Sequence, residues 1–207
     1  MSLSGLLKQS GIIFGGIILV GFAVRAADNP PASGKNLLKN GSFEQVKPFC
    51  RPEDNNEAAK PFVNWDAAGG WHDSLHVGTI AVDGNVSVLF MGAGWISHYG
   101  IPVESGKTYQ VTGWLQTYLQ SLPPLPAHPS GVTLSWGELA YAGAYVKIDA
   151  GAAGTLWVYT LSGLHPWRQL SGKFTVPQGV KYVALTIGGG GGGGWFWADD
   201  FRVTELP

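Results

Sequence analysis

The residues with the clearest chemical pattern lie in the run 108–119, where aromatic and amide side chains alternate with apolar ones. In an extended strand, alternate residues point to the same face, so Trp114, Gln116 and Tyr118 share one face. Flat aromatic rings pack against the apolar C–H faces of sugars, and amides form hydrogen bonds with hydroxyls. The stripe therefore predicts a sugar-binding face. The alternative is that these rings pack beneath a loop or against a protein partner.

Two later runs show the same alternation and extend this set of candidates. Tyr145, Lys147 and Asp149 alternate in one run, and Trp157 and Tyr159 alternate in the next. We expect these side chains to point outward like the first stripe, which adds Tyr145 and Trp157 to the candidate ligand-binding residues.

Patterns typical of enzymes are weak in this chain. His72 and His76 are four residues apart, but the metalloprotease glutamate between them is missing. There is no Gly-x-Ser-x-Gly motif, and Cys50 has no evident base beside it. A pair of carboxylates for glycoside cleavage stays open, because the sequence does not show which acids meet in space. We expect a protein that binds and does not catalyse.

The elements that would position these side chains are short, strand-like runs separated by turn residues. They are 36–43, 86–91, 108–119, 132–136, 144–148, 155–161, 168–175, 180–187 and 195–204. No amphipathic helix is evident after residue 35, so the pattern predicts an all-β sandwich. The seven consecutive glycines at 188–194 lack the lysine of a phosphate loop and predict a hairpin loop.

Composition agrees with an all-β protein and argues against nucleic acid as a partner. The 207 residues include 31 Gly, 13 Pro and 9 Trp, which punctuate strands or suit pleated surfaces. The net charge is −1, only 13% of residues are charged, and the basic patch that phosphates require is absent. The single cysteine excludes an intramolecular disulfide.

The N-terminus predicts a location outside the cytoplasm, either periplasmic or secreted. Residues 1–26 contain Lys8, an apolar run from Gly11 to Val24 and a small residue, Ala26, which is the layout of a signal peptide. The alternative is an uncleaved transmembrane helix over residues 5–24, about 30 Å long and thus just able to span a membrane. Residues 27–35 form a predicted linker, and 36–207 form the predicted domain.

Three motifs along the predicted domain resemble one family. They are Asn-Leu-Leu-Lys-Asn-Gly-Ser-Phe-Glu at 36–44, Val-Glu-Ser-Gly-Lys-Thr-Tyr-Gln-Val-Thr-Gly-Trp at 103–114, and a C-terminal part comprising 167–177 and 195–203. In this order they resemble the carbohydrate-binding modules of the xylan- and glucan-binding type, within the galactose-binding-like superfamily. The resemblance implies a jelly-roll β-sandwich.

The resemblance also implies particular sites. The ligand cleft of such modules lies on the concave sheet, to which a strand at 108–119 would contribute, and Trp71 matches a position where a tryptophan is common. A structural calcium ion between the first and last strands is also typical, and the matching positions here are Glu44, Asp199 and Asp200. Calcium prefers several oxygen ligands, which these carboxylates could supply in part.

Two functions remain open at this point. The first is recognition of a polysaccharide or an envelope glycan. The second is a membrane-anchored accessory subunit that stabilises a larger membrane protein complex. In the second case the Trp-rich face would be buried against other subunits, and glycines such as Gly11 and Gly15 would allow close helix packing.

Overall fold

The computed structural model describes residues 34–47, 61–67, 75–122, 130–134, 139, 143–189 and 193–207. Its first five strands are β1 (Asp66–Ala67), β2 (Leu75–Gly78), β3 (Ser87–Phe90), β4 (Gly94–Pro102) and β5 (Thr108–Leu119). The other five are β6 (Ala144–Asp149), β7 (Thr155–Leu161), β8 (Leu164–Thr175), β9 (Tyr182–Gly189) and β10 (Gly194–Glu205). A 3-10 turn, η1 (Gly151–Ala153), joins β6 to β7.

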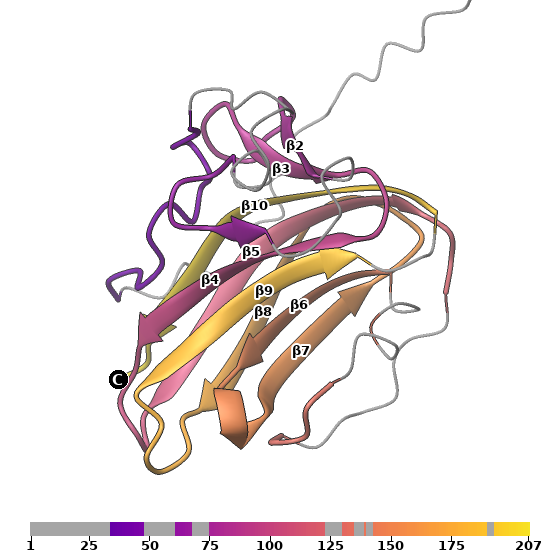
Figure 1. The fold of residues 1–207 in the computed structure, drawn as a ribbon. Helices are drawn as coiled ribbons and strands as arrows, with labels where there is room; N and C mark the ends of the chain where they lie inside the picture. Colours follow the sequence, from indigo (N-terminus) through magenta and orange to yellow (C-terminus); the bar gives the residue numbers. More distant parts are fainter. Residues whose placement is uncertain are drawn as a thin grey trace, which may run out of the picture.

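The strands form two antiparallel sheets that pack face to face (Figure 1). The first sheet has the order β1-β4-β9-β6-β7, and the second has the order β2-β3-β10-β5-β8. Strands that are neighbours in the sequence often lie in different sheets, so the chain crosses repeatedly between the two layers. The expected all-β sandwich is therefore confirmed for the described residues.

The core lies between the sheets and follows the alternation expected for β5. Tyr109, Val111 and Leu115 are buried on its inner face. Gly113 is required there, because a Cβ at this position would clash with the ring of Phe201. Burial of these apolar side chains from both sheets is the main force that holds the layers together.

Most predicted strands are confirmed, but the first is wrong. Residues 36–43 form turns, and their backbone is fixed by side chains. The Asn36 Oδ1 accepts N–H bonds from Leu38 and Val203, both at 3.0 Å, and Asn40 has a positive φ of 55°. Asparagine tolerates this left-handed conformation better than most residues. The predicted strand 132–136 is reduced, among the described residues, to one isolated bridge at Val132.

The glycine run does not form a hairpin. β9 ends at Gly189 and β10 begins at Gly194, but these strands belong to different sheets. The glycines therefore connect the two layers. Gly189 itself lies against Phe196, whose ring would clash with any Cβ at that position.

The N-terminal predictions lie mainly outside the described residues. This applies to segment 1–26, to its proposed anchor 5–24 and to most of the linker 27–35. Within the part of the chain that the structure describes, no helix is long and apolar enough to cross a membrane.

Candidate functional site

A groove runs over the outer face of the first sheet, and its floor is β9. After Tyr182 at its start, the outward residues of β9 are small: Ala184, Thr186 and Gly188. The register places Gly188 between Trp95 of β4 and Tyr145 of β6. Large side chains on the flanking strands therefore rise on both sides of a low central strand. The hollow encloses about 480 Å³.

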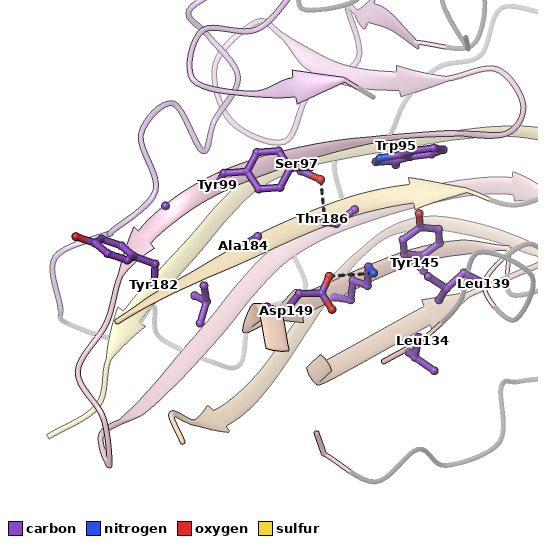
Figure 2. A pocket seen from close by; sticks show the side chains of 14 residues that line it. Trp95, Ser97, Tyr99, Leu134, Leu139, Tyr145, Asp149, Tyr182, Ala184 and Thr186 are labelled. Carbon is purple, nitrogen blue, oxygen red and sulfur yellow. Dashed lines mark hydrogen bonds and ion pairs between the residues drawn. The ribbon is translucent and has the colours of Figure 1, made fainter. Parts of the chain in front are cut away.

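Aromatic rings lie at both ends of the groove (Figure 2). Trp95 and Tyr145 lie toward one end, beside Leu134 and Leu139. Tyr99 and Tyr182 lie toward the other end, and both are more than half exposed. Tyr99 follows the same alternation along β4 as Trp95 and Ser97. The register shift between His98 and Ile101 then returns Ile101 to the buried inner face.

Polar side chains line the groove between the rings. The hydroxyls of Ser97 and Thr186 form a hydrogen bond of 2.8 Å. The Lys147 Nζ lies 2.9 Å from Asp149 Oδ2, and Thr155 Oγ1 donates a 2.7 Å hydrogen bond to Asp149 Oδ1. The one positive and the one negative side chain of the described lining are thus paired, so the groove presents hydroxyls and a compensated ion pair.

Tyr145 is held closely against the sheet. Its ring covers Gly188, where a Cβ would lie only 2.5 Å from the tyrosine Oη. Burial, with a smaller contribution from the charge of Asp149, raises the pKa of the Tyr145 hydroxyl above its ordinary value. The hydroxyl therefore stays protonated at physiological pH and can act as a donor.

Trp114, Gln116 and Tyr118 do not share a face with Tyr145. They lie on β5, in the second sheet, with their side chains on the outer face of that sheet. These candidates and Tyr145 therefore lie on opposite outer faces of the sandwich. Their strand was identified correctly, but pairing between strands decides which sheet a stripe belongs to, and alternation does not reveal it.

The remaining aromatic candidates are also separated from the groove. Trp157 pairs with Ile148 and points inward with it, against the expected outward orientation. Its indole packs on Gly172 of β8, where a Cβ would clash with it. Trp71 lies outside the described residues. Whether any of the named aromatics contacts a ligand stays a prediction.

Sequence reasoning missed Trp95, Tyr99 and Tyr182 as lining residues. Trp95 and Tyr99 were missed because β4 was not recognised, since glycines, His98 and Pro102 weaken its strand pattern. Tyr182 had a usable signal. It alternates with Ala184 and Thr186 inside a run that was correctly predicted as a strand.

The three acidic residues proposed as calcium ligands accept hydrogen bonds from backbone N–H groups or pair with a side-chain cation. Glu44 Oε1 accepts N–H bonds from Asn85 and Val86, at 3.0 and 2.8 Å. Asp199 is fully buried and accepts N–H bonds from Val82, Asp83 and Asp200. The Asp200 carboxylate pairs with Arg202 at 3.1 Å.

These contacts bear on the predicted metal site. Each N–H bond directs a positive hydrogen at an oxygen that a cation would otherwise use. Among the described residues, no group of three or more metal-ligating side chains could hold a metal ion. Calcium therefore stays a prediction.

Comparison with known proteins establishes the fold. No protein-family model and no curated protein matches the chain. The chain superposes on the CBM61 module TmCBM61, solved with β-1,4-galactotriose, with a TM-score of 0.51, 15% identity and coverage of 83% of this chain and 99% of that one. The chain has the jelly-roll fold of carbohydrate-binding modules. A second such module is the CBM22-1 xylan-binding domain of Paenibacillus barcinonensis Xyn10C. It gives a TM-score of 0.50 at 15% identity, and the superposition covers 86% of this chain and 98% of that one.

The same fold also occurs in enzymes. The enzymatically active domain of bacteriophage CBA120 tailspike protein 4 gives a TM-score of 0.55 at 12% identity, covering 83% of this chain but only 21% of that one. The cyclase Fisc from Fischerella sp. TAU is also similar, at 12% identity. The likeness therefore shows the fold alone, and the activity has to be argued from the site.

Proposed function

We propose that this protein is a non-catalytic module that binds a glycan chain in the groove over β4, β9 and β6. The observation that carries the proposal is the low floor of β9 between aromatic rings. A sugar ring can enter this hollow and stack its C–H face on Tyr99 or Tyr182, while its hydroxyls reach Ser97 and Thr186.

The length of the groove suits an oligosaccharide. Trp95 and Tyr99 are four positions apart on β4, and a strand rises by about 3.3 Å per residue, so the two rings are separated by roughly 13 Å along the strand. That separation exceeds the size of one sugar ring. The ligand we propose is therefore several sugar units long.

A neutral glycan fits the electrostatics of the groove. Lys147 is compensated by Asp149, so it offers little free charge for a uronic acid or a sulfate. Recruiting Lys147 to an anionic sugar would break this pair and leave Asp149 partly buried without its cation. Such a rearrangement is costly in a partly buried site.

Binding without catalysis fits the same residues. Glycoside hydrolysis needs two carboxyl groups on opposite sides of the bond that is broken. Among the described lining residues, Asp149 is the single carboxylate, and both of its oxygens already accept contacts from Lys147 and Thr155. The location we propose, outside the cytoplasm, rests on the N-terminal apolar run from Gly11 to Val24.

The test is an affinity comparison on the full-length chain. Binding to soluble xylan, galactan and mixed-linkage glucan is measured for the wild type, for Tyr99→Ala and for Tyr182→Ala. Polygalacturonate serves as an acidic comparison, and Val77→Ala serves as an exposed apolar control outside the groove. We expect each tyrosine variant to bind at least one neutral polysaccharide roughly tenfold more weakly, or about 1.4 kcal/mol, with Val77→Ala unchanged. Unchanged affinity in both tyrosine variants would refute the groove as the site.

A further inference from the structure

The outer face of the second sheet carries a row of large, exposed apolar side chains. The register aligns Leu164 of β8, Tyr118 of β5 and Trp195 of β10 in direct cross-strand positions. They are 65%, 64% and 47% exposed, which is unusual for three neighbouring residues of this size. Contiguous exposed apolar surface of this kind marks an interaction site more often than a chance arrangement.

The neighbouring cross-strand pairs on the same face also carry large side chains. Gln116 pairs with Trp197, which pairs with Leu89 of β3, and Trp114 lies opposite Asp199. Trp114 and Trp197 are each only 9% exposed, so these two rings are largely buried, and the open surface is supplied by Leu164, Tyr118 and Trp195. We call the face formed by Leu164, Tyr118, Trp195, Gln116 and Trp197 the aromatic platform.

The platform is uncharged. None of its five side chains is ionisable near neutral pH, and Asp199 is fully buried, with its oxygens taken by the amides of Val82, Asp83 and Asp200. Lys173 and Arg202 lie on rows beyond Trp114. Arg168 of β8 lies within the span of the platform, but it pairs with Leu115, which belongs to the inner face of β5. A nucleic acid, an acidic peptide or an anionic glycan would therefore find no complementary charge on the platform.

The remaining polar group of the platform is an amide. The Gln116 side chain is half-buried, and within the described part of the chain it has no hydrogen-bond partner. An amide beside exposed rings offers one acceptor and two donors, which match hydroxyl groups on the rim of a sugar ring. The exposed rings, the amide of Gln116 and the uncharged side chains of the platform together favour a neutral sugar polymer over an apolar protein surface.

We infer that the aromatic platform is a second carbohydrate-binding surface, which takes a neutral polysaccharide laid flat across Tyr118 and Trp195. It lies on the sheet opposite the groove, so both sites can be occupied at once. The protein is then bivalent, and it can bridge two polysaccharide chains. The platform stands independently of the groove, because the two sites share no residue.

The experiment uses the full-length chain and two double variants. Tyr118→Ala/Trp195→Ala removes the platform, and Tyr99→Ala/Tyr182→Ala removes the exposed rings of the groove. Both changes replace exposed side chains, and near-ultraviolet and far-ultraviolet circular dichroism confirm that each variant is folded. The readouts are sedimentation with microcrystalline cellulose and insoluble xylan, affinity for soluble oligosaccharides, and turbidity with long soluble xylan or glucan, which reports bridging.

We expect the platform variant to lose at least tenfold in affinity for the insoluble polymers and to lose the turbidity, while its affinity for oligosaccharides stays within twofold of the wild type. The conservative variant Trp195→Phe should keep most of the binding. If the platform variant sediments and bridges like the wild type, the inference is wrong. If the groove variant keeps wild-type affinity for oligosaccharides while the platform variant loses binding to insoluble polymers, the groove proposal fails and the platform proposal stands alone.

A protein partner on this face would give a different result. Light scattering would then show an oligomer of the wild type that dissociates in the platform variant. Alternatively, cross-linking in native membranes would place Trp195 against another subunit, and no polysaccharide would respond to the substitutions. Either result overturns the inference and supports the accessory-subunit alternative instead.

Discussion

The two outer faces of the sandwich carry similar aromatic residues, but they have different shapes. On the first sheet, Trp95 and Tyr145 flank β9, whose outward positions are held by Ala184, Thr186 and Gly188. On the second sheet, the large rings lie on the central strands β10 and β5 themselves. The first arrangement leaves a groove, and the second fills the middle of the face.

The difference shows that shape depends on side-chain volume at the central strand. On both faces, every second residue of a strand points outward, as in any sheet. Where the small residues line up across a central strand, the neighbours form walls. Where tryptophans line up, the same backbone gives a platform. A single substitution at the floor should therefore convert the groove toward the platform.

Filling the floor should have the largest effect. In Ala184→Trp, the indole would occupy the hollow between Tyr99 and Asp149 and leave no room for a sugar ring. We expect binding of soluble oligosaccharides to fall by about a hundredfold or more, which corresponds to roughly 2.7 kcal/mol. Ala184→Ser adds one oxygen and keeps the hollow, so it is the matched control.

Measuring binding at the groove and at the platform in the same variant tests whether the two faces act separately. Isothermal titration calorimetry should show that Ala184→Trp loses oligosaccharide binding, while sedimentation with insoluble polymers through the platform persists. If the variant still binds oligosaccharides with wild-type affinity, the groove is not where they bind, and the contrast in shape has no functional meaning.

Two glycines that lie under rings offer a stability comparison. Gly188 lies beneath Tyr145 on the groove face, and Gly172 lies beneath Trp157 between the sheets. Adding a methyl group at either position forces a packed ring to move. We expect Gly188→Ala and Gly172→Ala each to lower the free energy of unfolding by roughly 1–3 kcal/mol. Thermal unfolding followed by circular dichroism measures the change.

The two variants should differ in function. Gly188→Ala displaces Tyr145, which lines the groove, so it should weaken oligosaccharide binding as well as the fold. Gly172→Ala acts through Trp157, which faces the core, so its affinity measured well below the melting temperature should match the wild type. Equal affinities in both variants would mean that Tyr145 packs at the groove without contributing to binding.

The strands were predictable because local patterns specify them. The runs 108–119 and 155–161 were found with their observed ends, since Gly106 and Gly163 mark turns just outside them. Alternation in 108–119 also identified the inward residues Tyr109, Val111 and Leu115. These properties depend on residues that are close in the sequence.

The site was predicted less well because it depends on strand pairing. Trp114 and Tyr145 share the same local pattern, but β5 and β6 belong to different sheets, and only long-range register decides this. Trp157 shows a second limit. It lies on the edge strand β7, where one face is covered by the other sheet, and alternation cannot tell which face that is.

Asp199 gives a smaller effect that depends on pH. Burial raises the pKa of its carboxyl group to about 6, although the three backbone N–H donors oppose this shift. An acid with a raised pKa in the folded state is protonated there while the unfolded chain is ionised. Its contribution to stability is therefore complete below about pH 4 and is lost as the pH rises through 6.

The measurement compares the wild type with Asp199→Asn between pH 5 and pH 7. From this group alone, the wild type should lose roughly 1 kcal/mol of unfolding free energy over that interval, and Asp199→Asn should lack this component. Urea unfolding at each pH gives the difference. Parallel pH profiles would show that Asp199 keeps an ordinary pKa.

Calcium should have the smallest effect on either face. The carboxylates of Glu44 and Asp199 anchor the loop before β3 through N–H bonds, a role that calcium would otherwise fill by drawing oxygens together. We therefore expect the melting temperature in excess Ca²⁺ and in EGTA to agree within about 1 °C, a difference of less than roughly 0.5 kcal/mol. A rise of several degrees with Ca²⁺ that disappears in Asp199→Asn would instead identify the predicted ion. The loop would then bind the metal through these carboxylates, and its N–H groups would have to turn away.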